Sequence, residues 1–443
     1  MTDEKRPDRP IRAHYIPNSH LDREWTMDFQ HTRRLTVEFI DQLLKILDSI
    51  PEYEFLMDSQ TVPLEDYLEI RPEERERISR HVSSGRLHIG PWYSAPDMNM
   101  ILGESIARNL LVGHRDAARF GKVMKTGYTP FGFVHISQLP QIYRGFGIDT
   151  CFFYRGISKT LAPRSEFFWE SPDGSRVLAS RMSDQPRYNY YMNIWRNGLY
   201  GDQPERLNRE LKWSGGQVPF KLCNREAAFE HGTLLKRRTR LDREEVERQF
   251  HALIEREKKT FSTPELALMH GFDTSAPDML EDTVLRVCQA AAGDEVDLFY
   301  SSLPAYAEAV KKAVDADALP VLRGEMKYPE IRPNGFHQTF INIVSTRPRQ
   351  KQRTTETELR LIRQAEPFAA VADALGTPWP KPFFDRAWRH MLKSHAHDTI
   401  GGCAIDRIEE DAMFHLNQTD SIARAAVKDS LGALQGRIDT GDA

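Results

Sequence analysis

Cysteine is scarce in this chain of 443 residues, and the few cysteines that occur are widely separated. The four are Cys151, Cys223, Cys288 and Cys403. Because no two of them form a CxxC pair, the sequence indicates neither a disulfide scaffold nor a cysteine zinc site. We expect buried, reduced thiols.

Long apolar runs are also missing. Nowhere do eighteen apolar residues follow one another, and the N-terminal stretch MTDEKRPDRPIRA contains no apolar segment of the kind found in signal peptides. The sequence therefore predicts a cytoplasmic protein that does not interact with a membrane.

An excess of positive charge is absent as well. Lysine and arginine total 60 against 64 aspartates and glutamates, which gives a formal net charge of −4. No basic stripe is present that could neutralise a phosphate backbone. This balance argues against a nucleic-acid partner and leaves a homo-oligomer open.

The sequence does have enough apolar residues, 40%, to bury a sizeable core, and it is longer than one core usually serves. From Arg12 to about Tyr300, short apolar runs alternate with amphipathic segments, the rhythm of β-α units in a parallel sheet or barrel. From about Thr354 onward, long helical segments dominate, as in a helical bundle. We expect an α/β fold with two domains, a β/α barrel catalytic domain over residues 1–330 and a helical bundle domain over residues 331–443.

The main expected elements follow from hydrophobic period and turn residues. Strands are predicted at residues 14–20, 53–59, 88–92, 150–154 and 266–270. Helices are predicted at residues 34–50, 73–84, 103–119, 139–145, 244–259, 278–291, 356–374, 383–393, 405–417 and 420–434. Between Ser183 and Ala228, aromatic residues are scattered among Arg, Asn and Gly, which predicts a long loop that covers a substrate.

Two motifs carry candidate chemistry. His20 and Asp22 follow the first expected strand at positions i and i+2, so both side chains share a face and can reach one metal ion. Taken alone, this pair could be a solvated loop pair. Far along the chain, His397 and Asp398 precede a Gly-Gly turn. A site assembled from distant segments is typical of enzymes.

These motifs belong to a longer ordered series: SHLDREW, GRLHIGPWY, LGESIARNLLVGHR, QLPQIYRGFGID, FFYRG, STRPRQKQ and SHAHDTIGGC. The series runs from about Ala13 to Asp411 and resembles bacterial members of glycoside hydrolase family 38, the zinc-dependent α-mannosidases. The resemblance implies a seven-stranded β/α barrel followed by a three-helix bundle, one zinc ion in the active site and a carbohydrate substrate. It does not extend to the large β-sandwich domains that usually follow in this family.

The resemblance also implies a set of site residues. The implied zinc ligands are His20, Asp22 and His397. The implied substrate contacts are Trp25, Phe133, Arg155 and Asp398. Each of these side chains could be structural instead, and Arg155 could simply pair with a neighbouring acid. His395 is the poorer candidate of the two nearby histidines, because the family contact is the histidine directly before Asp398.

The catalytic carboxylates depart from the family pattern. Retaining glycosidases need a nucleophile and an acid/base on either side of the anomeric carbon. Asp273, in the segment MHGFDT, matches the family acid/base, although it could instead cap the helix that follows. The nucleophile position holds Phe131, and no Asp or Glu lies between Arg119 and Ile148 to replace it. Phenylalanine can neither attack an anomeric carbon nor bind zinc.

Three functions remain open at this point. The first is a zinc-dependent hydrolase of α-mannosides or a related glycoside, with Asp273 as acid and a free or zinc-bound water as nucleophile. The second is a zinc hydrolase of sugar amides or esters, similar to the polysaccharide deacetylases, with His135 or Asp273 as proton shuttle. The third is a sugar-binding pseudoenzyme without catalysis.

Overall fold

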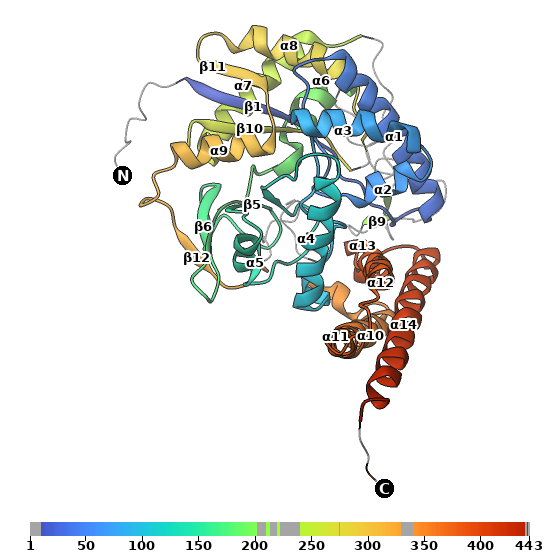
Figure 1. Ribbon diagram of the computed structural model, residues 1–443. Coiled ribbons are helices and arrows are strands. Elements are labelled where there is room, and N and C mark those ends of the chain that lie inside the picture. The colour runs from blue at the N-terminus through green and yellow to red at the C-terminus, as the bar shows by residue number, and fades with distance from the viewer. Residues whose placement is uncertain are drawn as a thin grey trace.

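A computed structural model describes residues 10–201, 210–212, 219–221, 240–273, 275–328, 340–438 and 441. Figure 1 shows a larger part that mixes helices and strands, and a smaller helical part, in orange and red, beside it. The expected α/β class is therefore confirmed. The expected domain boundary at residue 330 lies outside the described residues. Within them, no helix is long and apolar enough to cross a membrane.

The strands of the described residues form four sheets. They are β1 (Ile11–Pro17), β2 (Phe55–Leu56), β3 (Leu87–His88), β4 (Gly127–Tyr128), β5 (Thr150–Phe152), β6 (Glu166–Glu170), β7 (Arg176–Ser180), β8 (Glu210–Lys212), β9 (Pro219–Lys221), β10 (Glu265–His270), β11 (Val296–Tyr300) and β12 (Val321–Arg323). A parallel sheet has the order β10-β1-β11, a mixed sheet has the order β12-β6-β7-β5-β4, and β2-β3 and β8-β9 are pairs. No sheet closes on itself in the described part of the chain, so the seven-stranded barrel stays a prediction.

The helices of the mixed part cover these sheets. They are α1 (Phe29–Ser49), α2 (Val62–Leu68), α3 (Arg75–Ser84), α4 (Gly103–Ala118), α5 (Leu139–Gly145), α6 (Arg196–Tyr200), α7 (Arg243–Thr260), α8 (Leu280–Ala292) and α9 (Leu303–Ala313). The first helix begins five residues before the expected start at Arg34, because the Asp28 carboxylate accepts hydrogen bonds from the backbone N–H groups of Gln30 and His31 and so caps the helix.

The helical part consists of α10 (Pro348–Arg360), α11 (Glu366–Ala374), α12 (Lys381–Ser394), α13 (His397–Gly401) and α14 (Asp406–Gln435). A π-helical turn, Leu361–Ala365, joins α10 to α11, and α14 packs against α10, α11 and α12. Two separate helices were expected over residues 405–434, but α14 is continuous. Thr419, at the expected break, is buried and its hydroxyl donates to the backbone carbonyls of Ala387 and His415, so it does not interrupt the helix.

One pair of strands was missed, and one further expectation was wrong. The antiparallel pair β6 and β7 was not predicted, although its turn residues Pro172-Asp173-Gly174 are a recognisable hairpin signal. The segment from Ser183 to Ala228 was expected to be a long loop, but its described beginning contains a 3-10 turn (Pro186–Tyr188), a π-helical turn (Tyr191–Trp195) and α6. Residues 202–209, 213–218 and 222–228 of that segment lie outside the described residues.

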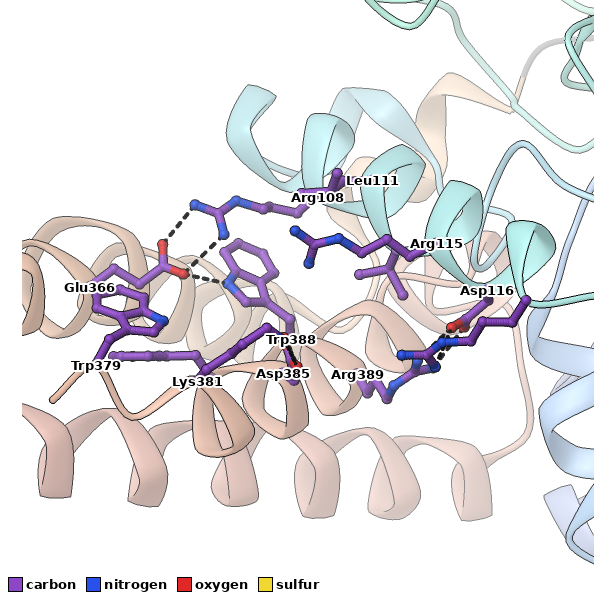
Figure 2. Close-up of a pocket in the computed structure, with 13 residues that line it drawn as sticks. Arg108, Leu111, Arg115, Asp116, Glu366, Trp379, Lys381, Asp385, Trp388 and Arg389 are labelled. Atoms are coloured by element: carbon purple, nitrogen blue, oxygen red, sulfur yellow. Dashed lines mark hydrogen bonds and ion pairs between the residues drawn. The ribbon is translucent and has the colours of Figure 1, made fainter. Parts of the chain in front are cut away.

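The two parts meet where α4 lies against α12. A cavity of about 280 Å³ lies at this junction. Figure 2 shows residues that line it, from α4 and from the helices of the helical part. Arg108 binds the Glu366 carboxylate with both terminal nitrogens, and Arg389 binds Asp116 in the same way. The first ion pair joins α4 to α11, and the second joins α4 to α12, the helix that precedes His397.

Candidate active site

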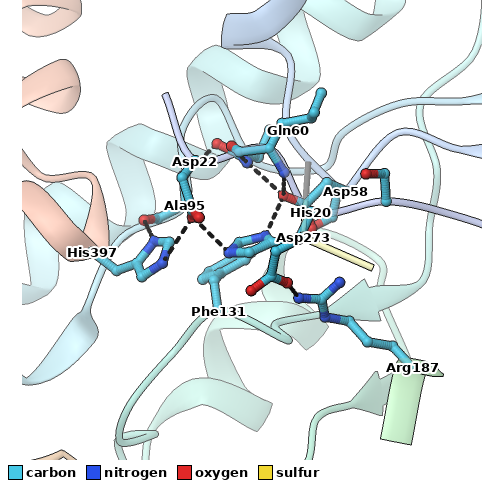
Figure 3. Close-up of polar contacts among 12 residues, drawn as sticks. His20, Asp22, Asp58, Gln60, Ala95, Phe131, Arg187, Asp273 and His397 are labelled. Atoms are coloured by element: carbon cyan, nitrogen blue, oxygen red, sulfur yellow. Dashed lines mark hydrogen bonds and ion pairs between the residues drawn. The ribbon is translucent and has the colours of Figure 1, made fainter. Parts of the chain in front are cut away.

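Three predicted residues form one compact cluster. His20 and Asp22 lie just after β1, and His397 is the first residue of α13. All three are buried, and one ligand atom from each lies within 4.8 Å of the others. The Asp22 Oδ1 atom is 2.8 Å from Nε2 of His20 and 3.4 Å from Nε2 of His397. Figure 3 shows the two imidazoles on either side of the carboxylate.

The outer nitrogens of both histidines contact the protein. Nδ1 of His20 lies 2.7 Å from the Asp58 carboxylate, and Nδ1 of His397 lies 3.3 Å from the backbone carbonyl of Ala95. Asp58 is itself held by the side-chain amide of Gln60 at 2.7 Å. These contacts fix each ring so that Nε2 points at Asp22, which is how proteins orient metal-binding histidines.

Sequence reasoning missed Asp58. It follows β2 at the end of the predicted strand 53–59, and an acid at the carboxyl end of a parallel strand was the signal that could have found it. Asp58 and Ser59 have positive φ angles of 40° and 54°, a conformation that costs energy for residues other than glycine. The turn is therefore strained where it presents the carboxylate to His20.

Gly271 brings the last strand of the site against the first. Its φ is +152°, and a Cβ atom there would lie 1.7 Å from the carbonyl oxygen of Asn18. Only glycine allows this approach. Two residues later, Asp273 forms a backbone bridge with His20. The predicted acid therefore lies next to the first ligand of the cluster. Its carboxylate contacts the Nη2 atom of Arg187, a buried residue that sequence reasoning also missed.

Position 131 forms an apolar wall beside the cluster. The Phe131 ring is fully buried and lies against the His397 ring, with centroids 6.0 Å apart and an interplanar angle of 30°. It also meets the Trp92 ring edge-on, with centroids 6.4 Å apart. The position where the resemblance implies a carboxylate thus lies beside the proposed ligands, but its side chain offers no donor atom.

Three of the four predicted substrate contacts, Phe133, Arg155 and Asp398, lie near Phe131 or His397. Phe133 packs edge-on against His397 with centroids 5.5 Å apart, and the Arg155 guanidinium lies 5.2 Å from the Phe133 ring. The Asp398 carboxylate is 3.6 Å from Nε2 of His397 and 3.0 Å from the Cys403 thiol. Trp25 is half-buried, and its backbone carbonyl accepts a hydrogen bond from the N–H of Ile405.

The cysteine prediction holds only in part. Cys151 and Cys288 are buried, but Cys403 is exposed, because it follows the Gly-Gly turn at the end of α13 rather than packing in a core. Cys223 lies outside the described residues.

Two other histidines near the motifs are core residues. His135 is fully buried, neither ring nitrogen has a hydrogen-bond partner in the described part of the chain, and its ring packs on Phe153 at 4.5 Å. His395 is fully buried too, with Nε2 at 3.6 Å from the Glu358 carboxylate. Burial lowers the pKa of each to about 3.

The electrostatics of the cluster favour a bound cation. Burial lowers the pKa of His20, but the carboxylates of Asp22 and Asp58 outweigh burial and raise it to about 10. Burial lowers the pKa of His397 to about 3. Burial and the charge of Asp22 raise the pKa of Asp398 to about 8. The carboxylates of Asp22, Asp58 and Asp398 all lie in this buried space, which solvates negative charge poorly. Two imidazole nitrogens and a carboxylate oxygen are donors that suit zinc, so the residues fit the implied ion.

Comparison with known proteins covers both parts of the chain. Residues 10–325 match "Glycosyl hydrolases family 38 N-terminal domain", and residues 338–434 match "Alpha mannosidase middle domain". The "Putative mannosylglycerate hydrolase" of Halalkalibacterium halodurans is 26% identical over 441 residues, which cover 97% of this chain and 43% of that protein. The human "Alpha-mannosidase 2C1" is 25% identical over 432 residues, which cover 95% of this chain and 35% of that protein.

The structural comparison agrees in fold. The crystal structure of an alpha-mannosidase from Enterococcus faecalis V583 matches with a TM-score of 0.79 at 24% identity, over 97% of this chain and 43% of that one. The chain spans less than half the length of these three relatives. Because the match to the N-terminal domain of the family covers most of its residues, the chain belongs to glycosyl hydrolase family 38.

Proposed function

We propose that this chain is a zinc-dependent glycoside hydrolase that acts on α-mannosides or a related glycoside, by a mechanism that Phe131 has altered. Family membership and the names of the relatives support the substrate class. The observation that carries the proposal is the buried cluster in which His20, Asp22 and His397 turn their ligand atoms toward one another beside Asp273. In this proposal residues 1–330 form the catalytic domain, and residues 331–443 supply the late ligand.

His20, Asp22 and His397 would hold the ion through Nε2, a carboxylate oxygen and Nε2. When bound, zinc supplies a Lewis acid that polarises a sugar oxygen. Asp58 and the Ala95 carbonyl would keep the two rings in the binding orientation.

The remaining residues would bind the sugar and exclude water. We assign ring packing to Trp25 and Phe133, and hydrogen bonds to sugar hydroxyls to Arg155 and Asp398. The Phe131 ring, at the position where the family nucleophile is expected, packs on the His397 ring.

Asp273 is the proposed general acid. Its Oδ1 atom contacts Arg187, so we assign the donated proton to Oδ2. As the bond between the anomeric carbon and the glycosidic oxygen breaks, that oxygen takes the proton, and a water molecule attacks the anomeric carbon and releases a proton to solvent. Direct attack by water inverts the anomeric configuration, whereas an enzyme nucleophile would retain it.

The stereochemistry of the product tests this proposal. Proton NMR during hydrolysis of an aryl α-mannoside should show β-mannose first, followed by slow mutarotation. If α-mannose appeared first, a second nucleophile would be required and the direct attack by water would be wrong. If no aryl α-glycoside were cleaved, the assigned activity would be wrong.

The same residues favour a second candidate, a zinc hydrolase of sugar amides or esters, because two histidines and one aspartate leave an open position on zinc. His135 is buried in the core, so Asp273 would be the proton shuttle in this case. Acetate release from acetylated sugars, without cleavage of aryl mannosides, would select this candidate. Binding of zinc and sugar without any turnover would select the pseudoenzyme.

A further inference from the structure

Arg187 is a buried cation at the edge of the candidate active site. It belongs to the 3-10 turn Pro186–Tyr188, its side chain is 1% exposed, and its Nη2 atom contacts Oδ1 of Asp273. Figure 3 shows the guanidinium pointing at the Asp273 carboxylate from the side opposite His397. Asp273 itself is 15% exposed, so the ion pair lies at the boundary between the site and the core.

The turn that carries Arg187 is fixed to the strand that leads to Asp273. Asn189, fully buried, donates its side-chain N–H to the carbonyl of Ala267 at 2.8 Å and accepts from the N–H of Met269 at 2.7 Å. Both partners belong to β10. Because one asparagine joins the turn to this strand, Arg187 and Asp273 are held as parts of one unit.

Aromatic packing makes the same connection beyond the end of the strand. Phe272, directly before Asp273, stacks on Tyr191 with centroids 5.5 Å apart and an interplanar angle of 8°. The Tyr188 ring also packs on the Phe272 ring, with centroids 4.9 Å apart, and the Arg187 guanidinium lies 4.3 Å from the Tyr188 ring. Hydrogen bonds from Asn189 to β10 and ring packing around Phe272 therefore both connect the segment that carries Arg187 to the segment that carries Asp273.

A second buried arginine shows what a structural role looks like in this fold. Arg181 is also 1% exposed, and its three guanidinium nitrogens reach the carbonyl of Ala162, the carbonyl of Pro163 and the carboxylate of Asp184. Arg187 contacts one carboxylate, whereas its Nε and Nη1 atoms have no hydrogen-bond partner among the described residues. A buried guanidinium with unsatisfied donors costs stability, and an apolar side chain would fill the space more favourably.

We propose that Arg187 is a positioning residue for Asp273: it binds Oδ1, fixes the carboxylate beside His20 and directs Oδ2 toward the reacting glycosidic oxygen. This inference rests on the proposed function, in which Asp273 transfers the proton. A general acid must lie within hydrogen-bond reach of the oxygen that it protonates, and a displacement of about 1 Å can cost roughly 100-fold in rate.

Two pairs of variants test this role. Arg187→Lys should lower kcat on an aryl α-mannoside about tenfold and Arg187→Met roughly 100-fold, with KM and bound zinc little changed. Added guanidinium ion should restore part of the activity of Arg187→Met. The matched control Arg181→Lys should lower the melting temperature but leave kcat unchanged. Wild-type kcat in both Arg187 variants, or an equal loss in Arg181→Lys, would overturn the proposal.

Crystal structures separate this inference from the proposed function. If the wild type cleaves no glycoside, the proposed function fails, and the position of Asp273 decides the role of Arg187. Displacement of the Asp273 carboxylate in Arg187→Met, with His20 and Asp22 unmoved, supports positioning. A carboxylate that stays in its wild-type place overturns it, whatever the activity.

Discussion

The two sides of the candidate active site are built from different kinds of residue. On one side, His20, Asp22 and His397 face one another, and the outer nitrogen of each ring contacts Asp58 or a backbone carbonyl. On the other side, Phe131 presents an aromatic ring that packs between His397 and Trp92. The polar side offers three donor atoms that could hold a cation, whereas the Phe131 side chain has no group that could attack a sugar. We therefore propose that metal binding and nucleophilic attack are separable in this fold.

The histidines show a similar contrast. His20, His397, His135 and His395 are all buried, so burial alone does not identify a ligand. Only the first two have an Nε2 atom near Asp22 and an Nδ1 atom held by another group. We therefore expect the direction of the imidazole ring, rather than its burial, to distinguish a metal ligand from a core histidine.

The largest effect is expected from removing one proposed ligand. His397→Ala should lose bound zinc and reduce hydrolysis to background, because two protein ligands do not make a stable zinc site. His395→Gln, two residues earlier and equally buried, should keep its zinc. Metal analysis of both folded proteins provides the measurement. Equal zinc content in the two variants would remove the distinction between these histidines.

The next effect concerns the proton donor. Asp273→Asn should lower kcat about 10²- to 10⁴-fold on substrates with poor leaving groups, and much less on activated aryl glycosides that leave without a proton. Steady-state kinetics on a series of aryl leaving groups gives the dependence. A uniform loss across the series would contradict the assigned role.

A smaller effect is expected from the contact behind His20. Asp58→Asn should weaken zinc binding about 10- to 100-fold, because the carboxylate orients the ring and raises the basicity of Nε2. Asp48→Asn is the matched control, since the Asp48 carboxylate also lies 2.8 Å from a histidine, His81, but is 45% exposed and is not one of the proposed site residues. Competition with a chelator of known affinity measures both. Unchanged affinity in Asp58→Asn would mean that the ring needs no such support.

The smallest effect is expected from adding a carboxylate to the apolar side of the site. Phe131→Asp should tighten zinc binding by about tenfold, the equivalent of roughly 1.4 kcal/mol, because the new carboxylate lies beside His397. Where it cleaves a substrate, the first product should be the retained anomer. Phe131→Leu should change neither property. If the Asp and Leu variants bound zinc equally, position 131 would not face the ion.

The sequence predicted local structure where a single period or cap decides it. The helix Leu139–Gly145 has the expected bounds, β10 begins one residue before the predicted strand, and α7 extends one residue beyond the predicted helix at each end. The hairpin of β6 and β7 was missed although its turn residues carry a local signal, whereas the continuous α14 depends on contacts across the chain, such as the hydrogen bond from Thr419 to Ala387. Such contacts leave no local signal.

The site shows the same limit. His20, Asp22 and His397 stood out because their motifs form an ordered series, and the structure brings them together. Asp58 and Arg187 contact the candidate site residues His20 and Asp273. Asp58 had only its place at the end of a strand as a signal, and no motif marks Arg187. Arg187 comes close to Asp273 because Asn189 joins its turn to β10, through a hydrogen bond to Ala267, which is 78 positions away in the sequence. The sequence alone does not reveal such a contact.

Bound metal and hydrolysis in the same preparation test the central claim most directly. The purified wild-type chain should hold about one equivalent of zinc and cleave an aryl α-mannoside, and a chelator should abolish cleavage until zinc is restored. Cleavage that survives complete removal of the metal, or a folded protein that binds no zinc, would contradict it.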